Sequence, residues 1–175
     1  TEKGFHVPDI QNFKNLDELL SSIDAQYHIH GLSSLQSLPK GSVNFLWSQA
    51  VLEHIRKNEF LETMRETRRI LDPNGVCSHR IDLKDHLSCS KNNLRFKESI
   101  WESDFMANSG FYTNRIGYSE MIDYFRQAGF EVEVLNVERR WKTPPINPKK
   151  LDKKFASLPE NELNISGFDV LLMPK

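Results

Sequence analysis

The chain has 175 residues, of which 38% are hydrophobic and 27% charged, and this length and composition predict a single globular domain over residues 1–175. Its net charge of -1 argues against nucleic acid as a partner, and no apolar run approaches the ~18–20 residues of a membrane-spanning helix. Two cysteines are too few for a secreted disulfide framework, so we expect reduced thiols and a cytoplasmic location.

The first quarter of the chain predicts one helix and two strands. Residues 1–14 have the composition of an irregular lead-in, and Asn15 and Glu18 then form a capping box for a helix. Tyr27–His30 is expected to be a short strand. Val43–Trp47 follows a Lys-Gly turn and is rich in residues that favour strands, which indicates a strand buried on both faces.

The next segment predicts a strand–helix–strand unit. A helix is expected from about Ala50, and a second one over residues 58–71, where the turn signal Asp72-Pro73-Asn74-Gly75 ends it. Residues 76–82 then form the next strand. This order predicts a parallel pair of strands joined by a right-handed crossover.

The second half of the chain predicts an insertion, a helix and two late strands. Residues 84–117 are irregular and rich in Asn and Ser, and an insertion of this size over a sheet is usually a lid or a wall of a site. A helix over 119–128, capped by its first serine, precedes strands at 130–134 and 168–173, which indicate an antiparallel end of the sheet. Residues 139–154 form a basic, proline-rich connector.

Two motifs at a typical separation resemble one enzyme family. The segment from Asn44 to His54 resembles the fourth-strand segment of class I S-adenosylmethionine-dependent methyltransferases, and Arg65–Gly75 resembles their helix and Leu-x-Pro-x-Gly turn before the fifth strand. The closing Gly167–Leu172 is similar to a bacterial subgroup, so the resemblance covers residues 24–175. It implies a Rossmann-like α/β sheet, mostly parallel with an antiparallel end, and S-adenosyl-L-methionine as cofactor.

Some features of the family are missing from this sequence. The chain has no Gly-x-Gly loop and no acidic residue that would end a second strand, and Asn44 stands where the family usually has Asp. We therefore interpret the sequence as a methyltransferase domain truncated at its N-terminal strands. It is either a fragment of a longer enzyme or a shortened gene product that no longer catalyses.

The truncation affects the edge of the sheet. The family's strand order, 3-2-1-4-5-7-6, pairs the fourth strand with the first, so Val43–Trp47 would lack a neighbour on one side. Tyr27–His30 is one substitute partner, and a second copy of the chain is the other. We expect self-association, giving a homodimer through this exposed strand edge.

Two segments are implied by the resemblance to contact the cofactor. The first segment follows the expected third strand, where family members contact adenine through a backbone amide and an acidic side chain. Leu32 stands in place of that acidic residue, so only the backbone contact would remain. An ordinary loop is the alternative. The second follows Trp47 and lines the methionine part of the cofactor. The candidate cofactor residues are Gly31, Leu32, Ser33, Ser48, Gln49 and Ala50.

Four residues are candidates for catalysis. Glu53 and His54 lie on the acceptor side, where a histidine with an ordinary pKa of about 6.5 is a candidate general base. The alternative is a histidine that bonds a nearby backbone group. Asp82 and His86, after the fifth strand, are expected to face the substrate.

The run His79-x-x-Asp82-x-x-Asp85-His86 contains good ligands for a divalent metal. Strand alternation, however, directs His79 and Asp82 to opposite faces of the sheet, so we expect no metal.

Asn114 and Arg115 are candidates for substrate binding. An arginine is suited to a two-pronged grip on carboxylate or phosphate, and an ion pair that pins the loop is the alternative. The family resemblance therefore implies methyl transfer to a small-molecule or cell-envelope-precursor acceptor, impaired in this chain alone. A non-catalytic remnant that serves as an interaction module is the other reading.

Overall fold

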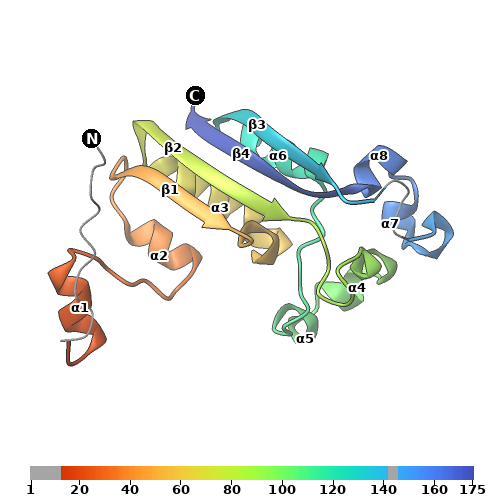
Figure 1. The fold of residues 1–175 in the computed structure, drawn as a ribbon, viewed down its shortest axis with the longest axis horizontal. Helices are drawn as coiled ribbons and strands as arrows, with labels where there is room; N and C mark the ends of the chain where they lie inside the picture. The colour runs from red at the N-terminus through yellow and green to blue at the C-terminus, as the bar shows by residue number, and fades with distance from the viewer. Residues whose placement is uncertain (1–12, 142–145) are drawn as a thin grey trace, which may run out of the picture.

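The structure is a computed structural model that describes residues 13–141 and 146–175. Its centre is a four-stranded sheet in the order β1-β2-β4-β3 (Figure 1). β1 and β2 are parallel, whereas β4 is antiparallel to both β2 and β3. This α/β sheet with an antiparallel end confirms the predicted Rossmann-like fold, and its order matches the 4-5-7-6 end of the family's sheet. The strands are Val43–Gln49 (β1), Leu71–Asp82 (β2), Phe130–Arg139 (β3) and Ile165–Pro174 (β4).

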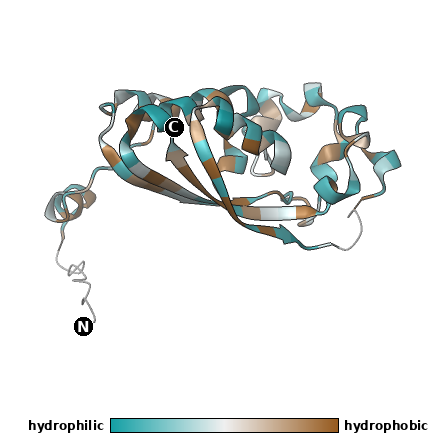
Figure 2. Ribbon diagram, turned by 90° about the horizontal axis from the view of Figure 1, so that it is seen from above, coloured by the Kyte–Doolittle hydropathy of each residue, from teal (hydrophilic) through white to brown (hydrophobic). Residues whose placement is uncertain are grey.

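Two long helices cover one face of this sheet. α3 (Lys57–Ile70) and α6 (Tyr118–Gln127) both lie on the same side, as the edge-on view in Figure 2 shows. α3 places Phe60 and Met64 one turn apart on its buried face, and Phe125 of α6 packs beside Phe60. Burial of each such side chain contributes about 1.5–3 kcal/mol, so this layer holds the helices on the sheet.

The remaining elements are short. α4, α5, α7 and α8 lie beyond the end of the sheet toward which β1 and β2 point (Figure 1). They therefore stand where the ligands of parallel sheets usually bind. The short helices are α1 (Leu16–Ser22), α2 (Leu32–Ser37), η2 (Leu52–His54), η3 (Asn92–Arg95), α4 (Glu98–Trp101), α5 (Asp104–Ala107), η4 (Pro148–Lys150), α7 (Lys153–Ala156) and α8 (Glu160–Leu163).

β1 is not the doubly buried strand that its composition predicts. Phe45 is 60% exposed and Trp47 is 61% exposed, whereas Leu46 packs against the core. The reason is that α3 and α6 cover one face only, and β1 pairs with β2 alone within the described part of the chain. Alternate residues of β1 therefore point to an uncovered face.

Three further sequence predictions were wrong in detail. Tyr27–His30 is irregular rather than a strand, and Tyr27 is 72% exposed. No helix begins at Ala50, because this residue has a left-handed φ of 52° and the chain forms the short η2 instead. Ser119 does not cap α6: Gly117 is the N-cap, and the Ser119 hydroxyl donates to Glu162.

Other predicted elements are confirmed. The Asn15 side chain accepts the amide hydrogen of Glu18 at the start of α1, and the helix predicted over 58–71 is α3. The turn signal at 72–75 becomes an irregularity within β2, where the amide of Asn74 donates to the Asp72 side chain. Most of the predicted lead-in (residues 1–12) and part of the basic connector (142–145) lie outside the described residues. Among the helices that the structure describes, none combines the length and apolarity needed to cross a membrane.

Candidate active site

A cavity of about 380 Å³ lies beyond the carboxyl ends of the two parallel strands. Glu53 follows β1 and Asp82 ends β2, and both line this cavity. The insertion after β2 and the short helices before β4 supply the rest of the wall. Its apolar lining residues include Leu83, Leu94, Ile116, Phe155, Leu158, Pro159 and Leu163.

Glu53 is the most unusual ionisable group of this cavity. It is 3% exposed, and its Oε2 has no hydrogen-bond partner among the described residues. Burial, with a smaller effect from the charge of Asp82, raises the pKa of the Glu53 carboxyl to about 7. A carboxyl group with such a pKa is suited to accept or donate a proton near neutral pH.

Asn114 fixes the backbone on both sides of Glu53. Its side-chain amide donates to the carbonyls of Leu52 (2.9 Å) and Ile55 (3.0 Å), and its own backbone amide donates to the carbonyl of Glu53 (2.7 Å). Asn114 is 1% exposed. Because these bonds join the insertion to η2, Asn114 holds Glu53 in place at the cavity wall.

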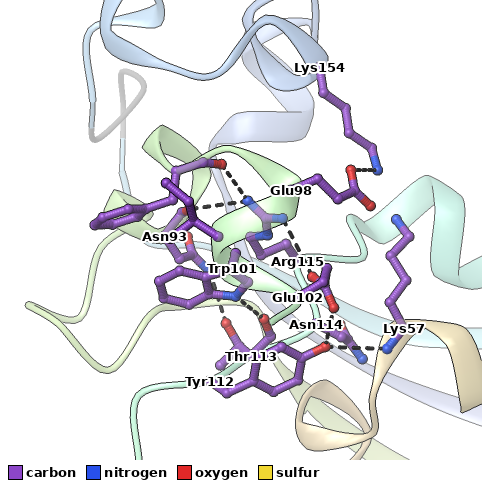
Figure 3. Close-up of polar contacts among 12 residues, drawn as sticks. Lys57, Asn93, Glu98, Trp101, Glu102, Tyr112, Thr113, Asn114, Arg115 and Lys154 are labelled. Atoms are coloured by element: carbon purple, nitrogen blue, oxygen red, sulfur yellow. Dashed lines mark hydrogen bonds and ion pairs between the residues drawn. The ribbon is translucent and has the colours of Figure 1, made fainter. Parts of the chain in front are cut away.

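Arg115 follows Asn114 and binds the chain itself. Its guanidinium donates to the carbonyl of Phe96 (2.8 Å). It also pairs with Glu102 (3.4 Å), as Figure 3 shows. The guanidinium carbon also lies 5.6 Å from the ring centre of Trp101 and 5.1 Å from that of Phe155. These contacts correspond to the loop-pinning alternative, although Arg115 also lines the cavity.

His54 and His86 lie close together but do not line the cavity. Their rings stack with centres 5.1 Å apart, and their Nε2 atoms are 3.4 Å apart. His54 Nδ1 is 3.0 Å from the carbonyl oxygen of Tyr112, which is the backbone contact considered as the alternative to a general base. Both histidines are exposed.

The residues of the considered metal run are separated. His79 is buried, its Nδ1 is 2.7 Å from the Ser48 hydroxyl, and burial lowers its pKa to about 4. Asp82 pairs with Lys84 (2.9 Å). Asp85 is 2% exposed and accepts backbone amide hydrogens from its own loop. Within residues 13–141 and 146–175, no group of three or more His, Cys, Asp or Glu side chains is placed to hold a metal ion.

The candidate cofactor residues lie in two places. Ser48, Gln49 and Ala50 end β1, where Gln49 and Ala50 are exposed while Ser48 is held by His79. The segment 31–33 begins α2, with Gly31 in a left-handed conformation (φ 52°) and open space around its Cα. When the cofactor is bound, these residues would offer it backbone groups and the Gln49 amide. They fit it on one side, because β1 has no strand on its outer edge in the part of the chain that the structure describes.

Sequence reasoning missed several cavity residues, of which Lys91 is the most informative. Lys91 is 6% exposed, and burial lowers the pKa of its ammonium group to about 8. It lies in the polar run Ser90-Lys91-Asn92, whose composition indicates a solvated loop. Phe155 and Glu162, from the segment before β4, also line the cavity. No periodic pattern marks such residues, because the cavity wall is irregular.

Comparison with known proteins agrees with this geometry. Residues 10–78 match the family model described as methyltransferase domain. None of the curated proteins compared with the chain matches it. An S-adenosylmethionine-dependent methyltransferase from Methanosarcina mazei has a similar fold, with a TM-score of 0.52 and 17% identity over 86% of this chain and 68% of that one.

Two other solved structures are similar over shorter parts of their own chains. An S-adenosylmethionine-dependent methyltransferase from Archaeoglobus fulgidus has a TM-score of 0.49 and 10% identity, over 85% of this chain and 66% of that one. One from Thermotoga maritima has a TM-score of 0.43 and 18% identity, over 79% of this chain and 59% of that one. This chain thus spans less than two-thirds of the length of either. Over residues 10–78 the chain is thus similar to the methyltransferase domain family, and its fold is similar to that of the protein from Methanosarcina mazei.

Proposed function

We propose that this chain carries the acceptor site of a cytoplasmic methyltransferase that acts on a small molecule or on a cell-envelope precursor small enough to enter the cavity. The observation that carries the proposal is the 380 Å³ cavity at the carboxyl ends of β1 and β2, with the buried carboxyl of Glu53 in its wall. Cavities of about 300–1,000 Å³ hold most small-molecule ligands of proteins.

Glu53 is proposed as the general base. S-adenosylmethionine, when bound, supplies an electrophilic methyl group on its sulfonium sulfur. Glu53 would take the proton from an acceptor hydroxyl or amine, because its raised pKa of about 7 leaves it partly ionised at neutral pH and basic enough to hold the proton. Asn114 positions Glu53 through the backbone, and the apolar wall excludes water from the acceptor.

The cofactor is proposed to bind weakly to this chain alone. Gln49, Ala50 and the segment 31–33 offer one side of a site, and the sequence has no Gly-x-Gly loop for the other. Each missing hydrogen bond removes about 0.5–1.5 kcal/mol, so the affinity falls by orders of magnitude when several are absent.

The test uses the polypeptide as its gene encodes it, incubated with S-adenosylmethionine carrying a tritiated methyl group and a small-molecule extract. We expect label in a product of low molecular weight. Label found only in protein or nucleic acid would contradict the small-molecule acceptor. Binding of S-adenosylmethionine without any transferred label would contradict catalysis and favour the second candidate below.

The second candidate is a non-catalytic interaction module. The observation that favours it is the uncovered face of the sheet, where Phe45 and Trp47 are exposed beside the outer edge of β1, which has no strand neighbour among the described residues. An apolar strand with unpaired backbone groups is a template for pairing with another chain. A homodimer through this edge is the simplest such assembly.

A further inference from the structure

Lys91 is a buried cation in the wall of the cavity, and no anionic side chain is paired with it among the described residues. It is 6% exposed and lines the cavity, yet its ammonium group makes no hydrogen bond or ion pair with any residue that the structure describes. A buried charge without a partner is unfavourable in the free protein. An anionic group of a ligand would remove that penalty.

The other cations at this cavity already have partners. Arg115 pairs with Glu102, and Lys154 pairs with Glu98 across the network drawn in Figure 3. Both bonds hold the insertion and the short helices together, so breaking them for a ligand would loosen the wall. Lys91 is therefore the cation that an anionic ligand can pair with at the lowest cost.

The carboxylates of the cavity limit the charge of this ligand. Glu162 accepts hydrogen bonds from the backbone amide and the hydroxyl of Ser119, each at 2.8 Å, and its negative charge acts on Lys91 without contact. Asp82 and Glu120 also line the cavity and are paired with Lys84 and Lys57. A group with two negative charges, such as a phosphate, would be repelled by this surrounding, whereas one negative charge is balanced by Lys91.

We propose that the methyl acceptor is a monocarboxylic acid with an apolar body, whose carboxylate binds the ammonium group of Lys91 and whose hydroxyl or amine faces Glu53. The apolar walls formed by Leu94, Phe155 and Leu163 would hold the body. This inference rests on the proposed function, because it assigns the acceptor of the same cavity.

Methyl transfer to the acceptor would exchange one bond of the methyl carbon for another. With S-adenosylmethionine bound, the acceptor oxygen or nitrogen would form a bond to the methyl carbon, and the electrons of the broken carbon–sulfur bond would return to sulfur, so that S-adenosylhomocysteine would be the leaving group. The proton of the acceptor passes to the Glu53 carboxylate. The carboxylate held by Lys91 takes no part in bond formation and sets the position of the acceptor.

The experiment measures binding by calorimetry, without cofactor, for three probes of one shape. These are 4-hydroxyphenylacetate, its neutral amide, and the corresponding phosphonate, which carries more negative charge. We expect the acid to bind about 10-fold or more tightly than either analogue, since hydrogen bonds to a charged group are the strong ones. Lys91→Met should remove the preference for the acid over the amide and leave the amide affinity unchanged. Lys149→Met, at an exposed lysine away from the cavity, is the matched control and should behave as wild type.

Each result distinguishes the inference from the proposed function. Equal binding of acid and amide by the wild-type protein would overturn the inference, and this comparison stands even if Lys91→Met does not fold. Tighter binding of the phosphonate would also overturn it. If the acid binds as expected but the encoded polypeptide transfers no methyl group, the binding site stands and the proposed function fails.

Discussion

Glu53 makes the stability of the protein depend on pH in a direction that the structure fixes. Burial raises the pKa of this carboxyl from 4.5 to about 7 in the folded state. The stability that Glu53 contributes as a neutral group is fully present below pH 4.5 and is lost as the pH rises through about 7. A shift of this size corresponds to about 3 kcal/mol of unfolding free energy.

Glu53→Gln removes this titration. The unfolding free energy of the variant minus that of the wild type should therefore rise by about 3 kcal/mol from pH 4.5 to pH 8. The difference is used because other groups also titrate. Burial lowers the pKa of His79 to about 4, so His79 makes wild type and variant alike more stable as the pH rises toward 6.5, and this effect cancels in the difference. Urea denaturation at several pH values measures it, and Glu131→Gln, at an exposed carboxyl of β3, serves as control. A difference that stays constant with pH would refute the burial argument.

Three other predictions follow from the same contacts. Asn114→Ala should lower the unfolding free energy by about 2–4 kcal/mol in urea titrations, because it removes two side-chain hydrogen bonds and leaves the carbonyl of Ile55 without its donor. Asn58→Ala, on the exposed side of α3, should change the unfolding free energy by about 0.5 kcal/mol or less. Light scattering should show that the wild-type protein is a dimer. Trp47→Lys should dissociate this dimer, whereas Leu135→Lys, on the opposite edge strand β3, should not. A monomeric wild type would exclude pairing through β1. S-adenosylhomocysteine should bind this chain with a dissociation constant orders of magnitude above about 1 μM in calorimetry, whereas a dissociation constant of about 1 μM or below would show that one side of the site is sufficient.

The sequence predicted the elements whose residues follow a regular pattern. α3 was found because its apolar residues recur at helical spacing before a strong turn signal, and the order of the strands followed from the resemblance of two motifs. The exposure of Phe45 and Trp47 was not predicted. Composition indicates how well a strand tolerates burial, but whether a second layer covers it depends on the rest of the fold.

The site was predicted in part, for a similar reason. Glu53, Asp82, Asn114 and Arg115 were all candidates, and the structure brings them to one cavity. Lys91 was missed because the burial of a lysine in a polar loop depends on long-range packing of the segment before β4. The sequence also did not indicate which of Glu53 and His54 is the better candidate for the general base. The two residues are adjacent, so the same sequence pattern surrounds both, and only the fold decides which one faces the cavity.

The central claim is tested most directly by the rate of methyl transfer in two variants of the encoded polypeptide, Glu53→Gln and His54→Gln. Each rate is measured with saturating S-adenosylmethionine and a labelled acceptor and is compared with the wild-type rate. Loss of a general base lowers a rate by about 10²–10⁴-fold. We predict that loss for Glu53→Gln, and a rate within a few-fold of wild type for His54→Gln, because His54 is exposed and does not line the cavity. The opposite order, or equal rates for Glu53→Gln and wild type, would contradict the assignment of this cavity as the acceptor site.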